Sequence, residues 1–187
     1  MAKFFDNISD AQKAFIEDQH MFFVASAPLS QDGHVNVSPK GMDSFRVLGP
    51  NQVAYLDITG SANETSAHLQ ENGRITFMFC AFDGPPKILR LFGTGRVITA
   101  NDEQWDEFSN LFPPLSGTRQ IMVVDVHKTQ ESCGMGVPKF DFVEDRDALV
   151  KHWDKNGDDF VRDYWGRKNS ESQDGLKPYA LHPSTDD

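Results

Sequence analysis

The sequence is poor in cysteine and has no long apolar runs. Its two cysteines, Cys80 and Cys133, form no Cys-x-x-Cys pair, and no histidines stand at zinc-finger spacing. Neither a disulfide framework nor a metal site is therefore expected. No apolar run approaches the roughly 20 residues that a membrane-spanning helix needs, and the N-terminal residues lack the apolar stretch of a secretory signal. We expect a cytoplasmic protein.

Positive charge is also scarce. The 18 lysines and arginines are outnumbered by 28 aspartates and glutamates, which gives a net charge of −10 and a pI of about 4.9. Such a chain repels a phosphate backbone or an anionic bilayer at long range, so neither nucleic acid nor membrane is expected as a partner. The 39% hydrophobic content and 15 phenylalanines are typical of a folded globule, and 187 residues suit one domain.

Several common catalytic motifs are missing. The sequence contains no His-Glu-x-x-His, no Gly-x-Ser-x-Gly and no phosphate loop that ends in Gly-Lys-Ser/Thr. Gly93-Thr94-Gly95 and Gly134-Met135-Gly136 lack a third glycine and open no helix, so they are not dinucleotide-binding fingerprints. The chain therefore resembles no metalloprotease, serine hydrolase or P-loop enzyme.

Apolar periodicity predicts a chain rich in β-strands. The predicted strands are residues 21–27, 34–38, 45–48, 52–59, 74–82, 87–98 and 120–127. Helices are predicted over 9–19 with Ser9 or Asp10 as N-cap, over 61–72 with a Ser61–Glu64 capping box and a stop at Asn72-Gly73, from Asn101 to Pro113-Pro114, and over 144–168 with a break near Asn156-Gly157. Residues 168–187 are predicted to lie over the surface or to fray.

Most of these strands follow one another through short turns. Asp32-Gly33 suits a tight hairpin turn between the first two strands. Helical crossovers are too few for a parallel sheet, so we expect a mostly antiparallel barrel with added helices, an α+β fold. We place the barrel in residues 1–143 and assign residues 144–187 to helices and a tail packed on the same domain.

One segment has the features of an anion site. In residues 57–65 a strand passes through Gly60 into a helix whose first residues include Ser61 and Thr65. Free N–H groups at a helix start attract an anion, and a phosphate fits there. The alternative is an ordinary helix cap with no ligand, because every helix needs such a cap.

A second segment places polar groups beside a strand end. Residues 34–38 alternate, with Val35 and Val37 on one face and the polar residues on the other, and Lys40 follows. The ammonium of Lys40 is a natural counter-charge for a phosphate, although a solvated turn lysine is the alternative. Arg90 and Arg96 share one face of a later strand, where they serve either a ligand or a half-exposed surface.

The order of these features across roughly residues 10–140 resembles the FMN-binding split barrels related to pyridoxamine 5'-phosphate oxidase. The segments that carry the resemblance are Val35-Asn36-Val37-Ser38-Pro39-Lys40-Gly41, Thr59-Gly60-Ser61, Leu69-Gln70-Glu71-Asn72-Gly73, Ile75-Thr76-Phe77-Met78-Phe79 and residues 89–97. The resemblance implies an antiparallel split β-barrel that forms a homodimer and holds FMN at its interface.

The resemblance also implies which residues bind the cofactor. Carried over by position, Val37, Ser38, Pro39 and Lys40 form the segment at the flavin edge, Asp57, Ile58 and Thr59 the strand under the ring, and Ser61, Asn63 and Thr65 the phosphate loop, with Arg90 a further candidate.

The chain departs from the oxidase at two places. The oxidase carries Arg-Lys after the loop serine, where this chain has Ala62-Asn63. Charge-assisted hydrogen bonds contribute about 1.5–3 kcal/mol each, so Lys40 or Arg90 must compensate if FMN is to bind tightly. The C-terminal arginine-containing segment that binds pyridoxal phosphate is also missing, so oxidation of vitamin B6 is not expected.

These features favour an FMN-dependent oxidoreductase whose substrate the sequence does not identify. A flavin carries out hydride or electron transfer itself, so the lack of a catalytic triad is no objection. One alternative is a non-catalytic protein that holds a flavin, a deazaflavin or haem on the same fold, with His20 or His127 as the convenient haem ligands. Another is a structural dimer with a vestigial pocket.

Overall fold

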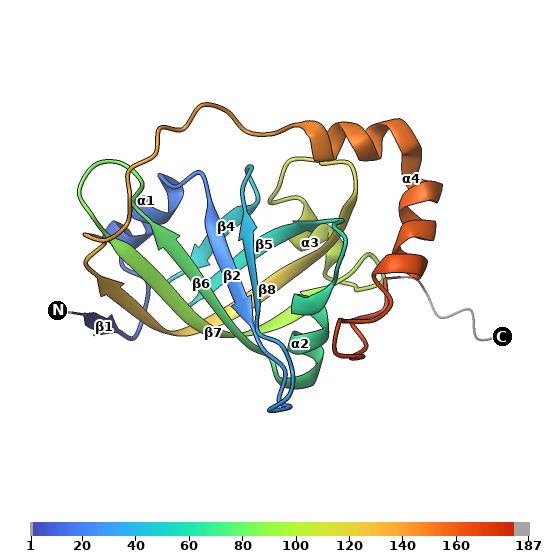
Figure 1. The fold of residues 1–187 in the computed structure, drawn as a ribbon, viewed down its shortest axis with the longest axis horizontal. Helices are drawn as coiled ribbons and strands as arrows, with labels where there is room; N and C mark the ends of the chain where they lie inside the picture. The colour runs from blue at the N-terminus through green and yellow to red at the C-terminus, as the bar shows by residue number, and fades with distance from the viewer. Residues whose placement is uncertain (1, 182–187) are drawn as a thin grey trace.

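The computed structural model describes residues 2–181 and shows one antiparallel sheet curled into an open barrel (Figure 1). Its eight strands include the path β3-β2-β6-β7-β8-β5-β4, and β1 pairs with the end of β8. The strands are β1 (Lys3–Phe5), β2 (Phe22–Ser26), β3 (Asn36–Lys40), β4 (Phe45–Gly49), β5 (Gln52–Ile58), β6 (Arg74–Cys80), β7 (Ile88–Ile98) and β8 (Thr118–Ser132). The helices are α1 (Asp10–Glu17), α2 (Glu64–Asn72), α3 (Trp105–Ser109) and α4 (Ala148–Lys168). The expected α+β antiparallel split barrel is confirmed.

Alternation along β5 builds two cores, one on each face of the strand. Val53 and Tyr55 point into the barrel, where aromatic rings meet edge to face, as with Phe22 and Phe45 at 4.9 Å between centroids. Ala54 and Leu56 point the other way, into a smaller cluster that α3 covers. Because β5 is buried on both faces, the polar Asp57 near its end must find partners inside the protein.

The first hairpin differs from its prediction. Strands β2 and β3 do pair, but residues 27–35 form a loop between them, so the predicted tight turn at Asp32-Gly33 is wrong. The reason is tertiary: the backbone N–H of His34 donates to Asp174 Oδ2 at 2.7 Å, and that of Leu29 donates to Glu71 Oε2 at 2.7 Å. These bonds to distant residues replace the ladder bonds that a tight turn would have kept.

Strand β3 alternates as predicted, and the structure shows where each face points. Val35, just before the strand, and Val37 are exposed, while Asn36 and Ser38 are half-buried. The polar face therefore turns toward the protein and the apolar face toward solvent. Because β3 is an end strand of the sheet, its exposed apolar face lies at the edge of the sheet.

Two helix starts differ from prediction. Helix α2 begins at Glu64 with Asn63 as N-cap, and the Ser61–Glu64 capping box is absent because Glu64 Oε1 instead accepts the backbone N–H of Gln173. Its predicted end is confirmed, since Gly73 adopts a φ of 70° and closes the helix. Helix α3 is shorter than predicted because Asp102 accepts the N–H of Gln104 and holds the preceding residues in a turn.

The C-terminal part packs along one side of the barrel (Figure 1). Helix α4 begins four residues later than predicted and breaks at Gly157, as the sequence indicates. Residues 169–181 lie on the barrel, where the backbone N–H of Tyr179 donates to Ser66 Oγ, and residues 182–187 of the predicted tail fall outside the described part. Within residues 2–181, no helix is long and apolar enough to cross a bilayer.

Candidate functional site

The site is built around a buried carboxylate at the end of β5. Asp57 is 1% exposed and receives Lys40 Nζ at 2.9 Å on Oδ1 and Arg119 Nη2 at 2.6 Å on Oδ2. Gln120 Nε2 also donates to Oδ2, at 2.9 Å. Two cations and an amide therefore satisfy one carboxylate that the fold removes from water.

Charge decides the ionisation of this carboxylate. Burial alone would raise the pKa of Asp57, but the nearby Arg119 and Lys40 outweigh burial and hold that pKa well below its ordinary value. Asp57 is therefore ionised at neutral pH. The three groups together carry one net positive charge, in a chain whose total charge is −10.

Arg119 and Gln120 connect this cluster to the loop before α2. Arg119 Nη1 donates to the carbonyl of Ala62 at 2.9 Å, and Gln120 Nε2 donates to Asn63 Oδ1 at 2.6 Å. Lys40 and the helix start, which the sequence analysis combined into one anion site, are thus joined through Asp57.

Sequence reasoning missed both linking residues. Arg119 and Gln120 stand at the start of β8, directly before the apolar run 121–124. A charged residue and an amide at the first positions of a buried strand are a signal, since such groups are seldom buried without partners. Their partners lie about 60 residues earlier, so spacing alone does not identify them.

Four of the five backbone carbonyl groups in the loop of residues 59–63 accept hydrogen bonds. Trp153 Nε1 donates to the carbonyl of Thr59 at 3.1 Å, and Asn169 Nδ2 donates to that of Gly60 at 3.0 Å. The carbonyl of Ala62 accepts from Arg119, and that of Asn63 accepts the N–H of Ala67 as the first bond of α2.

The amide groups of the same segment are free. Within the described part of the chain, none of the backbone N–H groups from Gly60 to Ser66 donates to a protein acceptor. A free N–H is normal in the first turn of a helix. Here the row extends four residues before α2, and because four of the five loop carbonyls are engaged, free donors outnumber free acceptors in the described loop.

Orphaned buried atoms gather beside this loop. Five buried side-chain atoms lack a partner in the described residues, and three of them belong to Asn63 (Nδ2), Gln120 (Oε1) and Asn169 (Oδ1). All three side chains border residues 60–63, because each bonds to the loop or forms part of it. Unsatisfied buried polar atoms are rare, and a cluster of them marks a place for a bound ligand or water.

The other predicted site residues fall into three groups. Ser38 and Thr65 stand near the loop, since Asn36 accepts from the Ser38 hydroxyl and donates to Thr65 Oγ1 at 3.1 Å. Ile58 is half-buried and Thr59 fully buried, whereas Val37, Pro39 and Ser61 are exposed. Arg90 lies apart, on β7, and donates to Ser132 Oγ at 3.2 Å.

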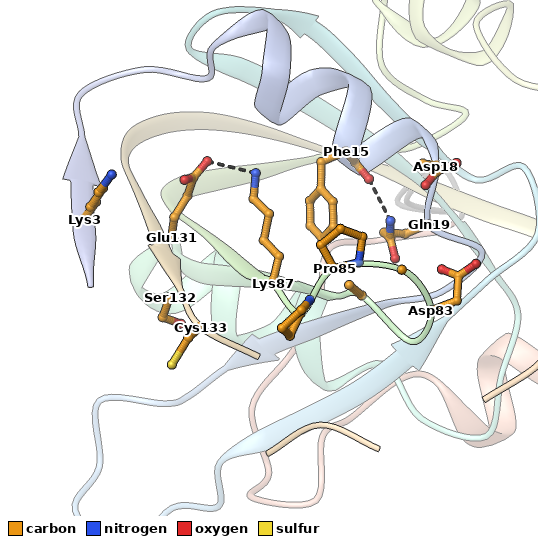
Figure 2. Close-up of a pocket in the computed structure, with 13 residues that line it drawn as sticks. Lys3, Phe15, Asp18, Gln19, Asp83, Pro85, Lys87, Glu131, Ser132 and Cys133 are labelled. Atoms are coloured by element: carbon orange, nitrogen blue, oxygen red, sulfur yellow. Dashed lines mark hydrogen bonds and ion pairs between the residues drawn. The ribbon is translucent and has the colours of Figure 1, made fainter. Parts of the chain in front are cut away.

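Two pockets lie elsewhere in the molecule. One, of about 560 Å³, is lined by Lys87, Glu131 and Cys133 among others, and Figure 2 shows the Lys87–Glu131 ion pair in it. The other, of about 600 Å³, has Phe22 and Phe45 in its lining. Neither pocket includes residues 57–65, and no cluster of metal-ligating side chains occurs among residues 2–181.

The sequence matches a family model and a known relative. A family model described as pyridoxamine 5'-phosphate oxidase matches residues 8–133. The pyridoxamine 5'-phosphate oxidase family protein ustO of Aspergillus flavus is 46% identical over 149 residues, which are 78% of this chain and 59% of that protein. The chain thus spans about three fifths of that relative's length.

Solved structures share the fold at lower identity. A crystal structure of a variant of HupZ from Group A Streptococcus has a TM-score of 0.53 at 20% identity and covers 67% of this chain and 99% of its own. That of a candidate pyridoxamine 5'-phosphate oxidase from Lactobacillus delbrueckii has a TM-score of 0.50 at 16% identity, covering 67% and 94%. Since the family model matches well over half of its residues, the chain belongs to the pyridoxamine 5'-phosphate oxidase family.

Proposed function

We propose that the chain is a flavoprotein that binds FMN and holds the cofactor's phosphate at the backbone amides of residues 60–66. The observation that carries the proposal is the row of free N–H groups over a loop in which four of five carbonyls are occupied. A phosphate offers several acceptor oxygens and a negative charge, which such a row at a helix start favours. Family membership supports the proposal, since the resemblance assigns the phosphate to Ser61, Asn63 and Thr65.

The charges around the loop favour an anion. Lys40 and Arg119 outnumber Asp57 by one charge, and Arg119 contacts the loop directly at Ala62. This positive charge replaces part of what the missing Arg-Lys pair would supply. The carboxylate of Glu64 does not occupy the free amides of the helix start, because it accepts the N–H of Gln173 instead.

One of the orphaned atoms at the loop, the donor of Asn63, fits the same ligand. The Nδ2 of Asn63 is a buried donor without an acceptor among the described residues, at the helix start. A phosphate oxygen beside residues 60–63 would satisfy it, and the cost of about 1–3 kcal/mol for an unsatisfied buried group would disappear.

An apolar surface is available for the ring and for a second copy. Val37 and Pro39 are exposed on the outer face of β3, an end strand of the sheet. Exposed apolar side chains on an edge strand are unfavourable unless something covers them. A homodimer with the cofactor at its interface would bury this face, and Arg90 on the outer face of β7 would then be available to the same interface.

The chain's residues bind and orient, while the cofactor does the chemistry. Bound FMN would supply hydride or electron transfer. The backbone amides of residues 60–66 would fix the phosphate end, and Lys40 and Arg119, which together exceed Asp57 by one charge, would hold a net positive charge beside it. Neither contribution needs a side chain that moves a proton. The proposed reaction class is the oxidation or reduction of a small molecule.

The test of the binding mode compares FMN with riboflavin, which lacks the phosphate. Ser61 is exposed on the loop, so Ser61→Asp adds a negative charge at the amides and Ser61→Asn adds a neutral side chain of the same shape. We expect Ser61→Asp to weaken FMN binding at least tenfold in a fluorescence titration, with Ser61→Asn close to wild type and riboflavin affinity unchanged in both. Equal FMN affinity in the two variants would show that the phosphate does not bind at this loop.

The visible spectrum tests the cofactor and the reaction. Protein that is colourless and stays so with added FMN contradicts the proposal, and a Soret band identifies haem instead. Bleaching of the flavin absorbance by NADH or NADPH, compared with dithionite, measures the oxidoreductase activity. Binding without bleaching by either nucleotide or by a thiol would favour the non-catalytic alternative.

A further inference from the structure

Helix α4 and the residue after it contact the loop from outside the family match. The family model ends at residue 133, so α4 and Asn169 lie beyond the matched region. Trp165 Nε1 donates to Thr59 Oγ1 at 2.7 Å, Trp153 Nε1 to the Thr59 carbonyl, and Asn169 Nδ2 to the Gly60 carbonyl. Three side chains of the C-terminal segment thus bond two consecutive loop residues.

The break in α4 makes this convergence possible. Trp153 and Trp165 are 12 residues apart, which in a straight α-helix corresponds to about 18 Å along the axis. Two indoles at that separation would not both reach one residue. Gly157, with φ 78° and ψ 171°, breaks the helix between them, and Figure 1 shows the two parts of α4 at a steep angle. Both indoles therefore reach Thr59.

The bonds from the C-terminal segment to the loop backbone engage carbonyl groups and leave the N–H groups free. The C-terminal segment supplies donors, and it occupies the carbonyl groups of Thr59 and Gly60. Thr59 is held from the opposite side too, since its N–H and hydroxyl both donate to the carbonyl of Gly117, at 2.8 and 2.7 Å. A peptide unit whose carbonyl is fixed has its N–H direction fixed as well. The amides of Gly60 and Ser61 are therefore held as unpaired donors without the ligand.

We propose that Trp153, Trp165 and Asn169 are positioning residues that make the loop selective for a phosphate group. The inference rests on the proposed function, because it concerns the same anion site. It adds that selectivity for FMN over riboflavin depends on side chains beyond the barrel region that the family model matches, which ends at residue 133. A preorganised row of donors loses little conformational entropy when a ligand binds. Because the donors bond the phosphate, this gain applies to FMN and not to riboflavin.

The experiment measures the ratio of FMN to riboflavin affinity in the full chain. The variants are Trp165→Phe and Asn169→Leu, each of which removes one donor, adds no charge and keeps the approximate shape. Trp105→Phe on α3 is the matched control, because that indole packs on the smaller core cluster and not on the loop. We expect each variant to lower the ratio at least fivefold through weaker FMN binding, with riboflavin affinity and the ratio of Trp105→Phe unchanged.

The two glycines of α4 provide a second matched pair. Gly157→Ala forces a side chain into a positive φ, whereas Gly166→Ala is placed in open space at a helical position. We expect Gly157→Ala to lower the FMN-to-riboflavin ratio and Gly166→Ala to leave it unchanged. Thermal unfolding of each variant shows that the fold is kept.

A measurement without FMN separates the inference from the proposed function. Inorganic phosphate is titrated while the NMR signals of amides 60–66 are followed. If wild type binds no flavin but these signals shift, and shift less in Trp165→Phe, the flavin proposal fails and the positioning role stands. The role is overturned if the signals do not respond to phosphate, if the variants lose FMN and riboflavin equally, if they bind as wild type, or if they bind FMN more tightly because α4 obstructs the site.

Discussion

Removing the guanidinium of Arg119 gives the sharpest test of the buried network at the site. Arg119→Met keeps the length of the side chain but leaves Asp57 with Lys40 as its one charged partner among residues 2–181. Breaking a buried ion pair from one side costs about 3–5 kcal/mol. We expect the lower end, about 3 kcal/mol, because Lys40 and Gln120 remain bonded to the carboxylate.

The same substitution at the outer partner costs less. The Lys40 side chain is 26% exposed, against 4% for Arg119, so water screens the Lys40–Asp57 pair more strongly. Lys40→Met should therefore cost about 1 kcal/mol. For a chain of this size, a loss of about 3 kcal/mol corresponds to a fall in Tm of roughly 6–12 °C.

Urea unfolding followed by tryptophan fluorescence measures both variants, at pH 7 and at pH 4. In Arg119→Met the pKa of Asp57 loses its main lowering influence, so protonation relieves the unpaired charge and the destabilisation should shrink as the pH falls. Equal costs for Arg119→Met and Lys40→Met, or a destabilisation that does not change with pH, would refute the view that a buried charge at Asp57 organises this site.

Three further perturbations test other parts of the structure. Gly117→Ala should cost more than about 2 kcal/mol in urea unfolding, because Gly117 has φ +79° and a Cβ there would clash with the Trp153 indole of α4; Gly49→Ala, with nothing within 4 Å, should cost far less. Burial lowers the pKa of His68, so the stability of the wild type should fall as the pH drops below the unfolded-state pKa of about 6.5. A His68→Asn variant whose stability fell as much as that of the wild type between pH 7 and 5 would contradict this. The pKa of Asp174 is lowered by its bond from the His34 backbone; Asp174→Asn should speed hydrogen exchange of residues 170–180, and unchanged exchange would show that this contact does not hold the tail.

The barrel itself was predictable because its signals are local. Alternation marks β3, and apolar runs with turn residues between them mark most of the others. The stop of α2 at Gly73 and the break of α4 at Gly157 follow from the preference of glycine for positive φ. Short connections between strands then favour antiparallel pairing, which the structure confirms.

The site was predictable only in part. The loop of residues 57–65 and Lys40 carry recognisable chemistry in sequence, namely a glycine before a helix start and a cation after a polar strand face. The amino-acid order does not show that Lys40 would be paired with Asp57, nor that Arg119 would complete the pair from 62 positions away. Buried charges choose partners by distance in space, and that distance depends on how the sheet curls.

Sequence alone thus determined strands β2 to β8, their antiparallel class and the polar character of the segment before α2, because each depends on residues a few positions apart; β1 was not predicted. Only the tertiary structure decided the loop between β2 and β3, the partners of Asp57 and the docking of α4 on Thr59. Each of these depends on contacts between segments far apart in the chain, such as His34 with Asp174. Their geometry exists only once the barrel has closed and the C-terminal segment has packed against it.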